Sequence, residues 1–196
     1  MTAQRSRTQG RPSATDHAAI ERAAFRLFEQ QGFDDTTMEQ IADAVGVGRR
    51  TLFRYFPSKN DIPWGQFDES LEFFQRQFAA VPTGTPTADA VHRCVVAFNS
   101  FDDDVLDLHR FRMRLILETP ALQAHSAIKY EAWRRVIAEF VAERLSLAPD
   151  DRVPRLIGHI SLAMSVAAYE QWLNSRSTSV TDLLDTVFRD LRHYLA

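Results

Sequence analysis

The chain has 196 residues and a mass of 22.4 kDa; 45% of its residues are hydrophobic, 25% are charged, and its formal net charge is −3 at pH 7. This composition is ordinary for a soluble protein and is sufficient for one hydrophobic core or two small ones. The single cysteine, Cys94, excludes an intramolecular disulfide, and we find neither a secretory signal nor an apolar stretch of the roughly 20 residues that cross a membrane. We therefore predict a reduced, cytoplasmic protein with no membrane partner.

Charge is unevenly distributed along the chain. Residues 1–60 hold nine basic and seven acidic side chains, whereas the remainder holds fourteen basic and nineteen acidic ones. A basic head on an acidic body is typical of proteins that bind a polyanion, because contacts with phosphates supply much of the affinity. A chance fluctuation of a few charges gives the same numbers, so this interpretation needs support from a motif.

The spacing of apolar residues predicts an all-α protein of about nine helices, because no segment alternates between apolar and polar residues. Residues 1–12 are basic and without periodicity, and we interpret them as a flexible arm. The first predicted helix runs from Ala14 to Gln31, and Gly32 follows where a left-handed residue can end the helix.

Two short helices are predicted next. Thr36 with Glu39 and Thr37 with Gln40 each have the spacing of a capping box, which begins a helix that runs to Ala44 or Val45. Gly46 permits a turn into a third helix over 48–55. Helices this short cannot hold a core alone and must pack on the first, so the pattern predicts a helix-turn-helix.

The rest of the chain is predicted to form a larger helical domain. Ser58 and Asp61 repeat the capping-box spacing and predict a single helix from 58 to 81. Further helices are expected over 86–100, 103–118, 121–147, 151–174 and 180–195. The predicted domains are the arm 1–12, the helix-turn-helix domain 13–57 and the helical effector-binding and dimerisation domain 58–196.

The third predicted helix carries side chains suited to DNA. Arginine matches the paired acceptors of guanine in the major groove, while hydroxyls and lysine suit phosphate oxygens. The outward-facing candidates are Arg49, Arg50, Thr51 and Arg54, with Tyr55 and Lys59 following. The three arginines alone are equally compatible with an ordinary solvated face. The glycine turn between two short helices favours the DNA-binding interpretation.

A family resemblance is carried by the stretch TTMEQIADAVGVGRRTLFRYFPSKNDI, residues 36–62, and by AAFRLFEQQGF before it. The stretch resembles the DNA-binding segment of the TetR family of bacterial transcriptional regulators. This resemblance implies a homodimer with a three-helix DNA-binding domain and a larger domain that binds a small molecule. It implies base contacts from Arg49, Arg50 and Thr51, phosphate contacts from Thr37, Tyr55 and Lys59, and either kind of contact from Arg54.

Two further segments resemble a subgroup of that family. PSKNDIPWGQFDESL, residues 57–71, and RMRLILETPALQAHS, residues 112–126, are similar to TetR-type regulators that accompany mycofactocin biosynthesis genes in actinobacteria. This resemblance implies that the effector is a long-chain acyl-CoA or another elongated hydrophobic molecule.

Candidate effector and dimer residues lie in the larger domain. Arg112 interrupts an apolar seam, where it can meet an anionic or carbonyl group of a ligand or pair with a carboxylate such as Glu118. The aromatic candidates, which can equally be plain core, are Trp64, Phe67, Phe74, Phe101, Phe111, Trp133 and Tyr169. The last two predicted helices carry apolar rows over 157–168 and 183–194, and the family resemblance implies that they form the dimer interface.

No motif supports catalysis. The chain has no nucleophile elbow, phosphate-binding glycine loop or zinc-binding histidine motif, and its six histidines lack ligand-like spacing, so we expect no enzyme activity, metal or cofactor. The leading hypothesis is a repressor that binds a palindromic operator in double-stranded DNA as a homodimer and is released by an effector. An activator, a regulator without a ligand, and a helical enzyme or carrier are the alternatives.

Overall fold

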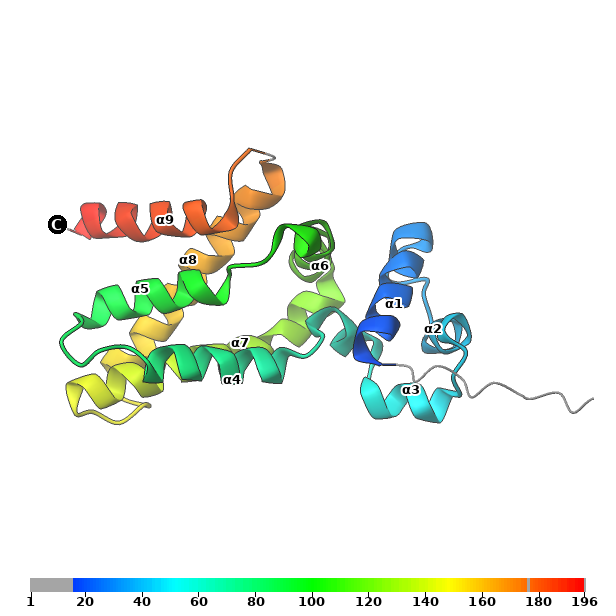
Figure 1. The fold of residues 1–196 in the computed structure, drawn as a ribbon, viewed down its shortest axis with the longest axis horizontal. Coiled ribbons are helices and arrows are strands. Elements are labelled where there is room, and N and C mark those ends of the chain that lie inside the picture. Colours follow the sequence, from blue (N-terminus) through cyan, green and yellow to red (C-terminus); the bar gives the residue numbers. More distant parts are fainter. Residues whose placement is uncertain (1–15, 176, 196) are drawn as a thin grey trace, which may run out of the picture. The chain divides into compact units, whose positions relative to one another are not determined.

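A computed structural model describes residues 16–175 and 177–195, the side chain of the last of these excepted. Over these residues the chain forms nine α-helices and two short 3-10 helices, with no strand (Figure 1). The predicted all-α class is confirmed, whereas the predicted arm 1–12 lies outside the described residues. The chain divides into two compact units, Met1–Gly65 and Gln66–Ala196. None of the described helices is long and apolar enough to cross a membrane.

The first unit is built on three helices and a short 3-10 turn. Its elements are α1 (His17–Gln31), α2 (Met38–Val45), α3 (Arg49–Tyr55) and η1 (Lys59–Trp64). Each helix buries an apolar side chain that is inaccessible to solvent: Ile20 of α1, Ile41 of α2 and Leu52 of α3. Burial of such side chains stabilises short helices that are marginal in isolation.

Local capping fixes where α2 begins and ends. The Thr37 hydroxyl accepts a hydrogen bond from the Gln40 amide at 3.2 Å, and the Thr37 amide donates to Gln40 Oε1 at 2.8 Å. The predicted capping box is therefore present with both of its bonds. Gly46 ends the helix at φ 70°, in the left-handed region that glycine adopts without a steric penalty.

The prediction of a single helix over 58–81 is wrong. The chain instead forms η1, breaks at Gly65 with φ 54°, and resumes as α4 (Phe67–Ala79). Pro63 lacks the amide hydrogen that an α-helix needs at this position. The expected capping box at Ser58 also fails, because the Ser58 hydroxyl donates to the Asp61 carboxylate at 2.7 Å rather than capping backbone. Residues 58–65 consequently pack in the first unit.

The second unit surrounds two long helices. Its further elements are α5 (Thr87–Phe98), η2 (Asp103–Val105), α6 (Leu106–Glu118), α7 (Pro120–Leu145), α8 (Arg152–Asn174) and α9 (Val180–Leu195). Figure 1 shows α7 and α8 crossing behind α4 and α5, and α7 packs along α8 with the other helices around this pair. A Cβ atom added at Gly158 would lie 3.0 Å from the Arg134 carbonyl oxygen, so glycine permits the close approach of α8 to α7.

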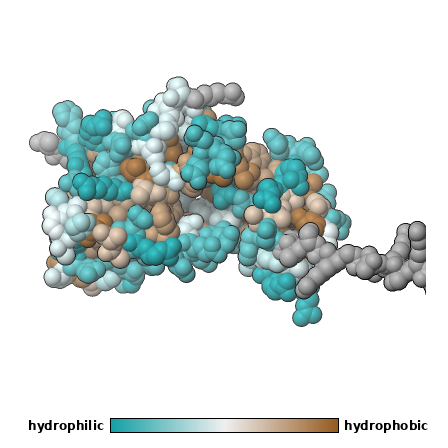
Figure 2. Space-filling model, in the orientation of Figure 1, coloured by the Kyte–Doolittle hydropathy of each residue, from teal (hydrophilic) through white to brown (hydrophobic). Residues whose placement is uncertain are grey.

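The core of this unit is aromatic and aliphatic. Phe74, Trp133 and Tyr169 belong to one buried cluster, together with Ala168, Leu183 and Leu184. Hydrophilic side chains predominate at the edges of each unit in the face that Figure 2 shows, and hydrophobic side chains reach the surface in smaller patches.

Candidate functional site

The α3 helix presents a basic face that its own core residues anchor. Leu52 and the following Phe56 are buried, at 0% and 2% exposure, while Arg49, Arg50 and Arg54 are exposed. Thr51 is half-buried beside them. Burial of Leu52 and Phe56 thus fixes which way the helix faces and directs the arginines to solvent.

The three arginines are held differently. Arg49 Nη1 lies 2.9 Å from Glu39 Oε1 on α2, and its guanidinium carbon lies 5.3 Å from the centroid of the Phe53 ring. The Arg54 guanidinium carbon lies 5.5 Å from the Tyr55 ring centroid. Arg50 forms no ion pair with any side chain that the structure describes. Of these three arginines, Arg50 is therefore the one held by neither an ion pair nor an aromatic ring within the described part of the chain.

Thr37 and Tyr55 lie at the margins of this face. The Thr37 hydroxyl oxygen accepts its capping bond, so its proton is left to donate outward. The Tyr55 ring packs edge-on against His17 of α1, with ring centroids 4.9 Å apart. Both side chains are consequently fixed by contacts within the first unit.

Lys59 has a different environment from the one expected. Its ammonium donates to the backbone carbonyls of Phe33, Asp34 and Thr36 at 2.6, 3.1 and 2.8 Å. Burial lowers the pKa of Lys59, and the nearby carboxylates of Asp34 and Asp35 oppose that shift. The expected phosphate contact would compete with these three bonds.

Glu39 is predicted from the sequence as a capping partner of Thr36, whereas its ion pair with Arg49 is not predicted. It lies in the first turn of α2, where an acidic residue is common, so its local position gave no sign of its partner. Its ion pair with Arg49 joins two helices across the turn at Gly46. Only a three-dimensional placement of α2 against α3 reveals this pair.

A line of hydrogen bonds crosses the apolar core of the second unit. Asn99 Nδ2 donates to the Val95 carbonyl at 2.8 Å, which orients Asn99 Oδ1 to accept from the Tyr169 hydroxyl at 2.7 Å. The Tyr169 oxygen lies 2.9 Å from His109 Nε2. Because Tyr169 donates to Asn99, His109 donates to Tyr169 as the neutral tautomer protonated at Nε2.

Burial shifts the pKa values of the groups along this line. It lowers the pKa of His109 to about 4 and raises that of Tyr169. Burial likewise lowers the pKa of Arg112 to about 10, opposed by the nearby Tyr169. At neutral pH His109 is therefore uncharged, while Arg112 stays charged.

Arg110 ties α6 to the end of α8. Its guanidinium donates to the backbone carbonyls of Trp172 and Ser175, and its guanidinium carbon lies 3.9 Å from the centroid of the Trp172 ring. The sequence analysis did not single out Arg110, because carbonyl acceptors leave no mark in the side-chain pattern.

The predicted effector residues do not all lie together. Phe74 stacks on Trp133 at a centroid distance of 5.3 Å in the core that also contains Tyr169, and Phe67 packs at the margin of that core. Arg112, half-buried on α6, lies near enough to Tyr169 for the two to interact electrostatically, and Phe111 is half-buried on the same helix. Phe101 is exposed before η2, with its ring centroid 3.9 Å from that of His109, and Trp64 is buried in η1 of the first unit. Glu118 is the alternative partner expected for Arg112, but its Oε1 atom lies 3.9 Å from Nε of Arg114.

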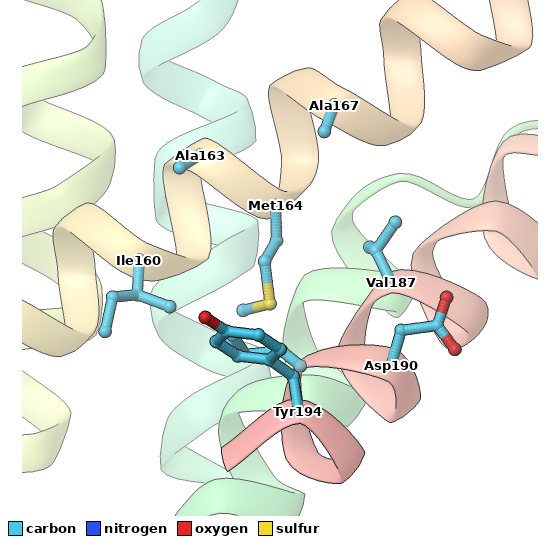
Figure 3. A pocket seen from close by; sticks show the side chains of 8 residues that line it. Ile160, Ala163, Met164, Ala167, Val187, Asp190 and Tyr194 are labelled. Atoms are coloured by element: carbon cyan, nitrogen blue, oxygen red, sulfur yellow. The ribbon is translucent and has the colours of Figure 1, made fainter.

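An apolar groove of about 520 Å³ lies between α8 and α9 (Figure 3). Its lining residues are Ile160, Ala163, Met164 and Ala167 of α8 and Val187, Asp190, Leu191 and Tyr194 of α9. Tyr194 is 85% exposed. The predicted dimer rows therefore do not form a single surface. Some of their residues line the groove, whereas Ala168, Leu183 and Leu184 face the core.

The depressed pKa of His109 gives a pH prediction. The unfolded chain takes up a proton on this histidine below about pH 6.5, whereas the folded protein resists protonation until about pH 4. The free energy of unfolding should therefore fall as pH decreases across this window, by up to about 3 kcal/mol from His109 alone. Denaturant unfolding at a series of pH values measures the effect.

Substitution isolates this contribution. His109→Gln keeps a donor toward Tyr169 and should flatten the pH dependence between pH 6.5 and 4. His159→Gln, at an exposed position of α8, is the matched control and should leave the wild-type dependence in place. A His109→Gln curve parallel to that of the wild-type protein would contradict the assignment.

Known proteins resemble this chain in sequence and in fold. Residues 20–62 match the N-terminal domain of bacterial regulatory proteins of the tetR family, and residues 85–196 match the MftR C-terminal domain. A Mycobacterium tuberculosis protein assigned as the mycofactocin biosynthesis transcriptional regulator MftR is 42% identical over 183 residues, which is 93% of this chain and 92% of that protein.

Two solved structures share the fold at low sequence identity. The fatty acid degradation regulator FadR from Bacillus halodurans has a TM-score of 0.61 at 17% identity and covers 89% of this chain and 96% of its own. Thermus thermophilus FadR, a TetR family repressor in complex with lauroyl-CoA, has a TM-score of 0.55 at 19% identity and covers 89% of this chain and 92% of its own. The sequence matches and the helix-turn-helix geometry establish that this chain belongs to the TetR family of transcriptional regulators, with an MftR-type C-terminal domain.

Proposed function

We propose that the protein is a homodimeric repressor that binds a palindromic operator and is released by an acyl-CoA. The observation that carries the proposal is the α3 face, on which Arg50 and Arg54 are exposed and the helix is anchored by Leu52. Arginine on a recognition helix is suited to the paired acceptors of guanine in the major groove.

The contacts of the first unit suggest a division of roles on DNA. Arg50 and Thr51 read base edges, and Arg49 does so from an orientation limited by its pair with Glu39. Thr37 and Tyr55 contact phosphates from fixed positions, and Arg54 reaches either bases or backbone. Fixed phosphate contacts set the register in which the arginines meet the bases.

A second copy of the chain is proposed to cover the α8–α9 groove. The groove is lined almost entirely by apolar side chains, and a contiguous exposed apolar surface is typical of an interaction site. A two-fold dimer also has a functional advantage, because two recognition helices about 34 Å apart, or a multiple of this, read two half-sites.

The effector is proposed to bind in the second unit near α6. The complex of Thermus thermophilus FadR with lauroyl-CoA supports an acyl-CoA as the ligand class. Phe67, Phe74, Phe111 and Trp133 supply apolar surface for an acyl chain, while Arg112 and Tyr169 supply polar groups for its head. Trp64 lies in η1 of the first unit and is not part of this proposed site.

Release from DNA requires different effector affinities in two conformations. A ligand that weakens operator binding about tenfold must favour the non-binding conformation by about 1.4 kcal/mol. Fluorescence anisotropy with DNA from upstream of the protein's own gene, with and without a series of acyl-CoA thioesters, tests this. Salt-sensitive binding that one thioester weakens at least tenfold is expected, and binding that no thioester changes would contradict the acyl-CoA proposal.

Arg50→Ala should lower operator affinity by roughly 1–3 kcal/mol and relax base preference, because a base contact is lost while phosphate contacts remain. Competition titrations with operator and random DNA measure both effects. Arg76→Ala, at an exposed position of α4, is the matched control and should bind operator like the wild-type protein. Equal losses on operator and random DNA would remove Arg50 from base readout.

Ala167→Glu should convert the dimer to a monomer, because it places a charge in the apolar groove without disturbing the core. Sedimentation velocity measures the oligomeric state, and operator affinity should fall when dimerisation is lost. Ala88→Glu, at an exposed alanine of α5, provides the same chemical change outside the groove and should leave the dimer intact. A dimer in both variants would place the interface elsewhere.

A further inference from the structure

The connection between α1 and α2 forms a cage of carbonyl groups around Lys59. Oxygens from Phe33, Asp34 and Thr36 converge on Lys59 Nζ at 2.6 to 3.1 Å. The Phe33 ring centroid lies 4.4 Å from the same nitrogen. An ammonium group has three hydrogens, so these carbonyls engage every donor that Lys59 has.

This cage joins segments that are far apart in sequence. Lys59 begins η1, whereas its acceptors lie more than twenty residues earlier, immediately before α2. Thr36, one of the acceptors, also donates its hydroxyl to the Gly32 carbonyl at 2.7 Å. The next residue is Thr37, which caps α2 and lies at the margin of the basic face. The position of the Thr37 hydroxyl is thus linked to Lys59 through a single peptide unit.

We propose that Lys59 positions the start of α2 for DNA binding, and that it does not itself contact a phosphate. The inference rests on the proposed binding of DNA by the first unit and assigns Lys59 a different role there. In this role Lys59 holds the α1–α2 connection so that Thr37 meets the DNA backbone while α3 enters the groove. Lys59 is then a positioning residue whose ammonium organises protein carbonyls.

The shape of the ammonium group makes the two roles separable. Three carbonyls that converge on one point fit a compact ammonium with three donors. A guanidinium is planar and spreads its donors over several atoms, so it retains the charge but cannot fill the cage. Arginine would still serve well in a phosphate contact.

The experiment compares Lys59→Arg, Lys59→Gln and Lys59→Met with the wild-type full-length protein on the operator, at several salt concentrations. Circular dichroism and thermal melting establish a temperature at which every variant used is folded. We expect Lys59→Arg and Lys59→Met to lose affinity about tenfold. Their slope of log affinity against log salt should match that of the wild-type protein, because no phosphate contact is removed.

Lys59→Gln and a control complete the series. The glutamine side chain of Lys59→Gln lacks the charge but keeps two amide hydrogens for the cage, so this variant should bind DNA better than Lys59→Met. Lys129→Met, at the other lysine of the chain, removes the same charge from the second unit and should bind like the wild-type protein. Wild-type affinity in Lys59→Arg, or a salt slope reduced by about 0.9 in Lys59→Met, would overturn the inference in favour of a phosphate contact.

A double-substitution cycle distinguishes positioning from general stabilisation. Thr37→Asp keeps a good helix cap but sets a negative charge against the proposed phosphate, so it should weaken DNA binding in the wild-type background. That loss should shrink in the Lys59→Met background if Lys59 positions Thr37. Additive losses would overturn the positioning role. If the wild-type protein binds no DNA, the proposed function fails. Failure of the Lys59 inference is a different result, because the wild-type protein then binds DNA and only the pattern among the variants differs.

Discussion

The burial of one leucine decides how this protein can meet DNA. Helices of eight and seven residues are too short to be stable in isolation, so α2 and α3 exist because Ile41 and Leu52 are removed from water in the core of the first unit. Leu52 also sets the rotation of α3 about its own axis. That rotation determines where the basic side chains on the opposite face of the helix point. Recognition chemistry in the first unit is therefore a consequence of core packing.

The second unit handles polar groups in another way. Asn99, Tyr169 and His109 form a line in which each donor meets one acceptor, beginning at the Val95 carbonyl. Buried polar groups are costly unless they are satisfied, and a line with a fixed direction specifies the protonation state of its last member. The same apolar surroundings that would suit an acyl chain thus keep His109 neutral.

Local signals explain what the sequence could predict. The capping box at Thr37, the glycine turn and the buried positions of the first three helices all depend on neighbours within a few residues, and the structure agrees with them. Pro63 and Gly65 are local signals for the break before α4, but the spacing of Ser58 and Asp61 resembles a helix cap and predicts a continuous helix instead. The surroundings of Lys59 and Glu39 depend on contacts between elements, which spacing does not encode. The helical spacing of Phe74 and Trp133 likewise cannot tell whether these side chains pack in a core or line a cavity. The structure places both in the buried cluster.

The close packing at Gly158 links the inside of the second unit to its surface. The absence of a side chain there lets α8 lie against the Arg134 carbonyl of α7, and the opposite side of α8 carries Ile160 and Ala163 of the groove. A side chain at residue 158 would therefore shift α8 away from α7, and the groove residues that α8 carries would move with it. A single methyl group in the interior is therefore able to change the shape of the groove while every residue that lines it stays the same.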